Sequence, residues 1–362
     1  MKIQETGFAR ELITWYRAHK RDLPWRETKD PYKIWLSEII LQQTRVQQGL
    51  PYYQNFVSTY PTVFDLANAA EEEVLRLWQG LGYYSRARNL HATAKYIAEE
   101  LNGTFPTSYK ELLKLKGVGK YTAAAIASFA YQEAVASVDG NVYRVLSRVF
   151  GVSEDIASGR GQRYFQELAN ELIPHDLPDL FNQALMEFGA MHCTPKKPAC
   201  TTCPFVTVCE AYQHEMVDKL PVKTKKVKTR RRVFNYFVFK GEGTVLMQQR
   251  TGKDIWQGLF EFFLIEDEKF ITFAELLSAY DKGKEIRSVM EETPAVISYS
   301  KAYKHILSHQ KLEVQFVLVE VSEKKFLKSL LTTLGLRNLT IEEVQDVPKP
   351  ILIENYLDDY VY

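Results

Sequence analysis

The chain has 362 residues, of which 46% are hydrophobic and 13% aromatic, and its formal net charge is +1. This length favours two domains, and the apolar content is sufficient for well-filled cores. No apolar run is long enough to span a bilayer and no basic leader precedes one, which excludes a membrane-spanning protein. We therefore expect a soluble, cytosolic protein with no membrane partner.

The first part of the chain predicts buried helices. Apolar residues recur at helical spacing over residues 8–16, and a Leu-Pro-Trp-Arg segment ends that pattern. Asp30 and Pro31 supply a cap and a first-position proline for a helix predicted over residues 32–44. This helix is apolar nearly all round, so its acidic residue, Glu38, is expected in an apolar wall, where a carboxyl holds its proton tightly and suits a general acid. The alternative is a paired or solvent-reaching structural glutamate.

Further helices are predicted through Val57, Leu66 and Leu77, followed by a glycine-broken turn that enters a basic helix at residues 79–90. An aromatic side chain at such a turn, here Tyr83, can wedge into a stack of bases while nearby arginines meet phosphates. A tyrosine packed at a helix corner is the alternative.

Residues 112–128 predict two helices joined by a tight turn. A short apolar helix ends, Gly117 and Gly119 turn the chain, and an Ala-rich helix begins near Lys120. Glycine permits positive φ and close approach of a partner, and the free N–H groups at the next helix start can bind a phosphate. An ordinary helix–turn–helix corner is the alternative.

Asp139 precedes another predicted helix that begins at Gly140. The helix dipole and backbone donors at this position are expected to keep its carboxylate ionised. A plain N-cap without a chemical role is the alternative.

All four cysteines of the chain, Cys193, Cys200, Cys203 and Cys209, lie within one short, proline-rich loop. In a cytosolic protein this density indicates a metal and not disulfides. The spacing alone leaves zinc and a [4Fe–4S] cluster open.

A dense run of positive charge occupies the linker predicted over residues 218–232. Beyond the linker, apolar and polar residues alternate with a period of two, which is typical of strands. Because helical patterns also occur there, we predict an α+β domain. Its strands are expected at residues 233–239, 244–250 and 312–319, and its helices at 273–280 and 324–331.

Three motifs carry a resemblance to a known family. They are residues 35–46, the segment Leu115-x-Gly-Val-Gly-x-Tyr-Thr-Ala followed by Val138-Asp139-Gly140-Asn141-Val142, and the cysteine spacing. Together they resemble the adenine DNA glycosylases of the helix-hairpin-helix, or endonuclease III, superfamily, over nearly the whole chain. The resemblance implies a mainly α region of two helical lobes (1–217), with the hairpin at 112–128 and an iron–sulfur loop at 193–209. It also implies the basic linker at 218–232. The segments 248–250 (Gln-Gln-Arg) and 256–262 (Trp-Gln-Gly-Leu-Phe-Glu-Phe) resemble the Nudix-like lesion-recognition domain of the same family, which the resemblance places at 233–362 as an α+β domain.

The resemblance also assigns roles to residues. Glu38 and Asp139 would be catalytic, oriented with the sugar by Tyr121 and Asn141, and the four cysteines would hold one [4Fe–4S] cluster. The hairpin glycines, Gly117 and Gly119, would grip a DNA phosphate with a monovalent cation. The other DNA and lesion contacts would be Trp25 and Arg26 at the flipped adenine, Gln43 and Thr44 opposite the damaged guanine, Leu81 and the intercalating Tyr83, and Ser308 and His309 in a lesion-sensing loop. Relatives carry Phe-Ser-His in that loop, so Leu307 departs from their pattern.

The predicted activity is removal of adenine mispaired with 8-oxoguanine or guanine in double-stranded DNA, by a monomer associated with the bacterial nucleoid. Endonuclease III has a catalytic lysine where this chain has Tyr121, so we expect a monofunctional glycosylase with little strand cleavage. Lys120, one place earlier, is expected to point elsewhere. The alternatives are a bifunctional pyrimidine glycosylase and a non-catalytic iron–sulfur DNA-binding module. The carboxylate-rich Nudix helix does not occur, which argues against a pyrophosphatase.

Overall fold

The computed structural model describes residues 5–224, 229–290, 294–321 and 324–361. The chain divides into two compact units. Unit 1 contains residues 1–68 and 89–225, and unit 2 contains residues 69–88 and 226–362. The predicted combination of a mainly α region and a C-terminal α+β domain is confirmed.

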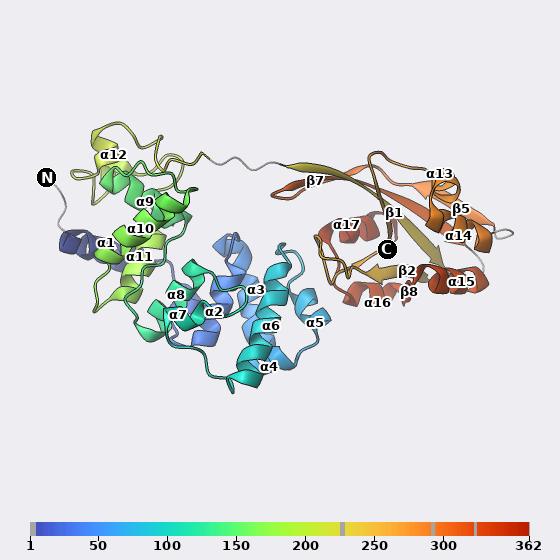
Figure 1. Ribbon diagram of the computed structural model, residues 1–362, viewed down its shortest axis with the longest axis horizontal. Coiled ribbons are helices and arrows are strands. Elements are labelled where there is room, and N and C mark those ends of the chain that lie inside the picture. The colour runs from blue at the N-terminus through green and yellow to red at the C-terminus, as the bar shows by residue number, and fades with distance from the viewer. Residues whose placement is uncertain (1–4, 225–228, 291–293, 322–323, 362) are drawn as a thin grey trace. The chain divides into compact units, whose positions relative to one another are not determined.

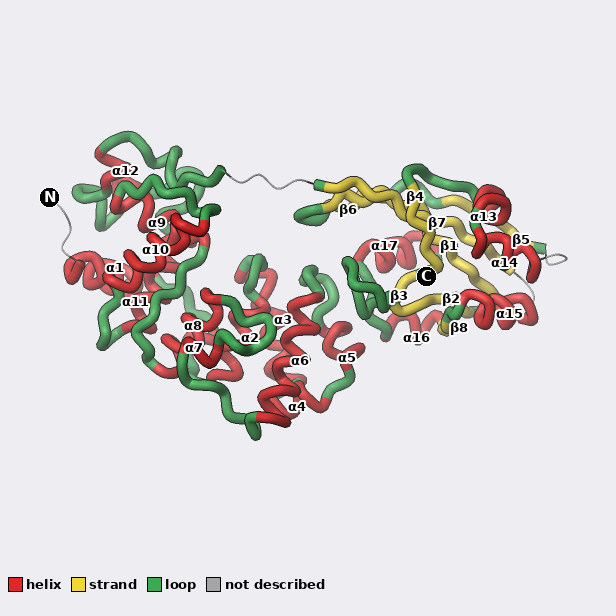
Figure 2. Tube along the Cα trace, in the orientation of Figure 1, coloured by secondary structure: helices red, strands yellow, loops and turns green. Residues whose placement is uncertain are grey.

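In the described residues of unit 1, helices joined by loops are the only regular secondary structure (Figures 1 and 2). One lobe contains α2 (Pro31–Ile40), α3 (Val46–Thr59), α4 (Val63–Asn68), α6 (Ser85–Glu100), α7 (Tyr109–Leu112) and α8 (Lys120–Tyr131). The other contains α1 (Glu5–His19), α9 (Gly140–Phe150), α10 (Gly159–Leu172), α11 (Pro178–Met191) and α12 (Glu210–Gln213). Two short 3₁₀ turns, η1 (Pro24–Arg26) and η2 (Cys200–Thr202), complete the unit. No helix in the described part of the chain is long and apolar enough to cross a membrane.

The helix that carries Glu38 is shorter than predicted. It was expected over residues 32–44, but α2 ends at Ile40 with Leu41 as its C-cap. Gln43 adopts a left-handed conformation with φ 55°, which ends the helix, and the Gln42 side chain donates to the Thr122 hydroxyl at 3.1 Å. A contact with α8 therefore draws these residues out of the helix.

The starts of α8 and α9 were predicted correctly from local sequence signals, the glycine turn and the aspartate cap. Helix α8 begins at Lys120 after the glycine turn, and α9 begins at Gly140 with Asp139 as its N-cap. Apolar residues of α1, α9, α10 and α11 form a single core beneath α9, and Phe8 and Phe188 are fully buried in it. Asp139 is thus presented from a rigid element.

Unit 2 is built on a mixed sheet whose path runs β3-β2-β1-β7-β5. Its strands are β1 (Arg230–Gly241), β2 (Thr244–Gln249), β3 (Phe260–Glu261), β4 (Phe263–Asp267), β5 (Ala295–Tyr299), β6 (Tyr303–Ile306), β7 (Gln310–Val321) and β8 (Arg337–Thr340). Its helices are α5 (Glu71–Leu77), α13 (Phe273–Ala279), α14 (Asp281–Met290), α15 (Lys324–Leu334), α16 (Ile341–Asp346) and α17 (Ile351–Tyr360). The two long central strands, β1 and β7, pair in parallel from Arg230↔Gln310 to Lys240↔Glu320.

The alternation of side chains along β1 divides the core of unit 2 into two layers. Phe237 and Phe239 face a core that includes residues of α13, α14 and α15. Tyr236 points to the other face, where it stacks on Phe316 at 5.3 Å and Phe316 stacks on Tyr356 of α17 at 4.0 Å. Aromatic strand residues thus bury both faces of the sheet.

The start of β1 differs from the sequence prediction, because the strand begins at Arg230 and not at Val233. Arg231 and Arg232, expected in the basic linker, form ion pairs with neighbouring carboxylates instead. Three lysines of that run, Lys225, Lys226 and Lys228, lie outside the described residues.

Residues 69–88 pack within unit 2. The Arg88 side chain donates through Nη1 to the Gln257 carbonyl at 2.6 Å. Gly258 has φ +87°, and a Cβ added there would lie 2.8 Å from the Leu75 side chain. These contacts join the turn that carries Leu81 and Tyr83 to the loop between β2 and β3.

Candidate active site

Glu38 and Asp139 lie in the walls of the same two cavities of unit 1. One cavity, of about 180 Å³, is also lined by Trp25 and Arg26, and it is called the inner cavity below. The other, of about 480 Å³, is also lined by Gln43 and residues of the glycine turn, and it is called the outer cavity. Glu38, Leu41, Tyr121 and Asp139 line both, so the two carboxyls, far apart in sequence, meet where the cavities adjoin.

Glu38 is 7% exposed and lies in the interior of α2. Desolvation of its carboxylate raises its pKa from 4.5 to about 7. The Tyr121 hydroxyl donates a hydrogen bond to the Glu38 carboxyl and opposes this rise, whereas the negative charge of Asp139 adds to it. The buried, apolar surroundings that the sequence predicted for Glu38 are present, and with a pKa of about 7 the carboxyl is protonated in about half of the molecules at pH 7.

Asp139 receives three hydrogen bonds at the N-terminus of α9. The backbone N–H groups of Asn141 and Val142 donate to its Oδ1 at 2.9 and 2.8 Å, and Asn141 Nδ2 donates to its Oδ2 at 2.7 Å. Burial nevertheless raises the pKa of Asp139 above its ordinary value, with these donors and the nearby Arg144 opposing the rise. The donors were expected and are found, but the desolvation that competes with them was not.

Asn141 is itself held by Arg144, one turn along α9. Arg144 Nη2 donates to Asn141 Oδ1 at 2.8 Å and to the Gly189 carbonyl at 2.6 Å, and its Nε donates to the Cys193 carbonyl at 2.7 Å. Gly189 lets the helices approach this closely, because an added Cβ would lie 2.7 Å from Asn141 Cβ. A continuous chain of hydrogen bonds therefore connects the Asp139 carboxylate with the cysteine loop.

The inner cavity also contains residues that the sequence analysis did not identify. Gln183, Met186 and Glu187 of α11 line it with Arg21 and Arg26. Although burial raises the pKa of Glu187, hydrogen bonds from Arg21 and Arg26 outweigh that effect and lower it to about 2. Arg26 reaches Glu187 at 2.8 Å, and Arg21 at 2.6 Å. The signal in the sequence was the polar residues of an otherwise apolar helix, the same argument that identified Glu38.

The two glycines of the turn differ, because Gly117 has a positive φ and a close neighbour, whereas Gly119 is extended and has free space beside it. Gly117 has φ +79° and an added Cβ would meet Asn89 at 2.8 Å, so this position requires glycine. Gly119 has an extended conformation, and nothing lies within 4 Å of a Cβ added there, so the backbone is open to a partner as the sequence predicted. Lys120, expected to point elsewhere, is exposed and lines the outer cavity with Gly119. Thr44 lines the inner cavity and Gln43 the outer one.

A separate cavity, of about 410 Å³, lies within unit 2 and is called the hairpin pocket below. One wall contains Leu81 and Tyr83, and the opposite wall contains Ser308 and His309 in the turn between β6 and β7. The hydroxyls of Tyr83 and Ser308 are hydrogen-bonded to each other across it. Tyr83 is 43% exposed, whereas Leu81 is buried. Four of the residues assigned to lesion recognition are thus brought together.

The four cysteines line one hollow beside Phe188 and Arg148. Cys209 is buried and the other three are half-buried, and Arg148 Nη1 lies 3.5 Å from the Cys193 sulfur. Burial raises the pKa of Cys203 to about 12, and the neighbouring cysteines add to that rise. Within the described residues no group of three or more His, Cys, Asp or Glu side chains is placed to hold a metal ion.

Two family descriptions match the chain. Residues 36–173 match the HhH-GPD superfamily base excision DNA repair proteins, and residues 235–359 match the NUDIX domain. Adenine DNA glycosylase of Buchnera aphidicola subsp. Schizaphis graminum is 37% identical over 256 residues, which are 70% of this chain and 74% of the relative. The enzyme of Buchnera aphidicola subsp. Baizongia pistaciae is 32% identical over 87% of both chains. The human adenine DNA glycosylase is 44% identical over 59% of this chain, which spans only 41% of that longer protein.

Solved structures of similar fold cover the helical part of the chain. A thermostable thymine-DNA glycosylase is 32% identical and superposes with a TM-score of 0.53, over 58% of this chain and 97% of its own. Endonuclease III in a non-covalent DNA complex has a TM-score of 0.51 over 59% of this chain and 99% of its own. At 22% identity the latter shows a shared fold.

Proposed function

The chain belongs to the adenine DNA glycosylases, base-excision repair enzymes that remove adenine by hydrolysis, and we propose that it acts on adenine opposite 8-oxoguanine or guanine with Glu38 and Asp139 as catalytic residues. The observation that carries this proposal is the meeting of these two carboxyls between the inner and outer cavities. An extruded nucleotide can then place its base in the inner cavity and its sugar between the carboxyls.

Glu38 acts as the general acid. Adenine leaves poorly as an anion, and a carboxyl with a pKa of about 7 can give a proton to a ring nitrogen at neutral pH. In the family that nitrogen is N7. As the bond to adenine breaks, the deoxyribose becomes an oxocarbenium ion.

Asp139 stabilises that cation electrostatically, or bonds to it transiently, until water attacks. Its charge contributes to the raised pKa of Glu38, which supports the assignment of Asp139 as the carboxyl that ionises first. Two carboxyls with different environments, one acid and one anion, match the arrangement of glycosidases by analogy. Tyr121 and Asn141 hold the pair in position.

The inner cavity offers groups that can recognise adenine. A glutamine amide presents a donor and an acceptor side by side, and adenine pairs with such an amide through its amino group and a ring nitrogen. Gln183 lies in the cavity wall, where its Oε1 also accepts from the Tyr16 hydroxyl at 2.5 Å, and Trp25 can contact the face of the base. Glu187 keeps the Arg26 guanidinium directed into the same wall.

The other DNA contacts follow from the outer cavity and the hairpin pocket. The open backbone at Gly119 and the start of α8 suit a DNA phosphate, with a monovalent cation at the hairpin. Tyr83 enters the base stack, and Leu81, Ser308 and His309 read the base opposite the adenine. Gln43 and Thr44 contact the gap left by the extruded nucleotide. One chain supplies all these residues, so the proposed enzyme is a monomer.

We also propose that Cys193, Cys200, Cys203 and Cys209 hold one [4Fe–4S] cluster. The donor set fits, because four sulfurs line one hollow and the Arg148 guanidinium beside them can offset thiolate charge. When bound, the cluster cross-links the loop and supplies no catalytic step. Iron content and a brown colour of the purified protein would test it, whereas stoichiometric zinc would contradict it.

The catalytic assignment is tested with Glu38→Gln and Asp139→Asn. Asparagine remains a good N-cap, so the second variant keeps the start of α9. Both variants should bind a duplex with an 8-oxoguanine:adenine pair but release adenine at least about a hundredfold more slowly. The control is Glu99→Gln, an exposed carboxyl of α6, which should release adenine normally. Normal release by either catalytic variant would refute the assignment.

A further inference from the structure

Besides the wall with Leu81 and Tyr83, the hairpin pocket has two further walls, and these two are held in different ways. The wall with Ser308 and His309 is a turn closed by the Leu307 N–H, which donates to the Gln310 carbonyl at 2.8 Å. The wall with Asp254, Ile255 and Trp256 belongs to the loop between β2 and β3. The backbone bonds of that loop, such as Gly258 N–H to the Arg250 carbonyl at 2.7 Å, close the loop on itself. Its attachment to the sheet must therefore come from side chains.

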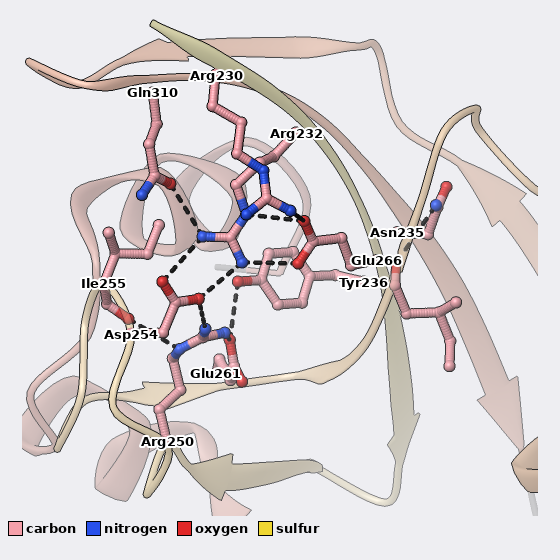
Figure 3. A network of polar contacts seen from close by, with 11 residues as sticks. Arg230, Arg232, Asn235, Tyr236, Arg250, Asp254, Ile255, Glu261, Glu266 and Gln310 are labelled. Atoms are coloured by element: carbon pink, nitrogen blue, oxygen red, sulfur yellow. Dashed lines mark hydrogen bonds and ion pairs between the residues drawn. The ribbon is translucent and has the colours of Figure 1, made fainter. Parts of the chain in front are cut away.

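Arg232 of β1 supplies the charged part of that attachment, and the Trp256 ring adds contacts with Phe234 of β1 and His305 of β6. Arg232 Nη1 and Nη2 donate to the two carboxylate oxygens of Asp254 at 3.0 and 2.7 Å (Figure 3). The same Nη1 donates to Gln310 Oε1 at 2.9 Å, directly after the Ser308–His309 turn. Arg232 is 7% exposed, so these charge-assisted bonds form with little competing water. A single guanidinium thus bonds to one residue of each of these two walls.

Neighbouring charged side chains fix the direction in which Arg232 points. Its Nε and Nη2 donate to the Glu266 carboxylate at 2.8 and 2.6 Å. Arg250 lies on the other side of Asp254, donating to Asp254 Oδ2 at 3.0 Å and to the Ile255 carbonyl at 3.1 Å. Figure 3 shows the two guanidinium groups with Asp254 between them. The fork cannot rotate without breaking several of these bonds.

We propose that Arg232 is a positioning residue for recognition of the base opposite adenine, because it sets the spacing between the Asp254–Trp256 loop and the Ser308–His309 turn. This inference rests on the proposed role of the hairpin pocket in lesion recognition. Arg232 contacts neither of the two turn residues, so its effect on recognition is exerted through Gln310. Lysine cannot replace it, because one ammonium group cannot reproduce the planar fork that meets three partners.

The inference is tested by the ratio of two rates in the full-length protein. Adenine release is measured under single-turnover conditions on duplexes with 8-oxoguanine:adenine and with guanine:adenine. Guanine lacks the oxidised ring edge that the turn reads, so only the first rate depends on the wall spacing. Arg232→Met should lower the ratio about tenfold, and Gln310→Leu, which removes one bond and keeps the ion pairs, severalfold.

The matched control is Arg231→Met. Arg231 is the preceding residue of β1 and pairs on the surface with Glu313 at 2.6 Å, so its replacement should leave the ratio unchanged. Ser308→Ala tests the premise separately. If it leaves the ratio unchanged, the lesion-recognition role of the pocket is wrong. If Ser308→Ala lowers the ratio but Gln310→Leu and Arg232→Met do not, or if both rates fall equally, the positioning role of Arg232 is refuted. Should Arg232→Met fail to fold, Gln310→Leu decides.

Discussion

Replacing Glu38 with glutamine should stabilise the folded protein at alkaline pH while abolishing adenine release. Folding moves the pKa of this carboxyl from 4.5 to about 7, because the ionised form loses its hydration in the wall of the inner cavity. Glutamine has nearly the same shape and no charge to desolvate. In the wild type, ionisation of Glu38 therefore lowers the free energy of unfolding, and the variant has no such ionisation.

The sign of the effect follows from proton binding. Between about pH 4.5 and pH 7 the folded state holds a proton on Glu38 that the unfolded state has released, so wild-type stability falls as the pH rises through this interval. At about 1.4 kcal/mol for each pH unit, the full loss is about 3 kcal/mol above pH 7. For a unit of this size that corresponds to a difference in Tm on the order of 10 °C.

Thermal unfolding of wild type and Glu38→Gln, measured from pH 5 to pH 9, gives this difference directly. The two Tm values should nearly coincide at pH 5 and separate as the pH rises, with the variant higher. Glu187→Gln is the matched comparison in the same cavity. Arg21 and Arg26 hold the pKa of Glu187 at about 2, so its stabilising contribution is complete above pH 4.5 and is lost only as the pH falls toward 2. This variant leaves two arginines unpaired and should be destabilised by about 3 kcal/mol or more throughout the range.

The decisive feature of this experiment is that two carboxyls of one cavity give Tm differences of opposite sign when each is replaced by glutamine. A Tm difference between wild type and Glu38→Gln that does not change from pH 5 to pH 9 would mean that Glu38 does not titrate in a desolvated site. A variant that is less stable at pH 9 would mean that the carboxylate is favourably paired there. Either result removes the physical basis for a general acid at this position.

Three further outcomes are expected. Single-turnover adenine release should fall about tenfold per pH unit above pH 7 as Glu38 loses its proton, and a rate that is constant to pH 9 would contradict the acid role. Borohydride should trap no covalent DNA adduct in the wild type, because Tyr121 stands where a lyase needs an amine, and efficient trapping that Lys120→Ala abolishes would overturn this expectation. Cys203→Ser should lose iron and brown colour, and an unchanged iron content would exclude this cysteine as a ligand.

The parts of the site that sequence could predict are those governed by local rules. Asp139 before Gly140 is a cap signal, and the cap is present with its expected donors. The glycine turn before Lys120 likewise gave the start of α8. The end of α2 was mispredicted because a contact between Gln42 and Thr122, distant in the chain, competes with continuation of the helix.

Tertiary burial explains most of what the sequence could not show. The raised pKa of Asp139 depends on neighbours from other helices that exclude water, and local donors alone suggested the opposite direction. Gln183 and Glu187 reach the inner cavity only because α11 packs against α9 and η1 lies beside them. In unit 2, the parallel pairing of β1 with β7 joins segments that β2 to β6 separate along the chain. A period of two predicts a strand but not its partner.

The secondary structure supports the proposed division of roles, in which Glu38 is the acid and Asp139 the anion. Glu38 lies inside α2, where every nearby backbone N–H is already bonded to a carbonyl one turn earlier, so its carboxylate receives no backbone donor. Asp139 lies at a helix N-terminus, where such donors are free, and it receives two of them. Glu38 is buried and Asp139 half-buried, yet only Asp139 is compensated by the backbone. Exchanging the two roles would require moving each carboxyl to the other kind of helix position, which no single substitution can do.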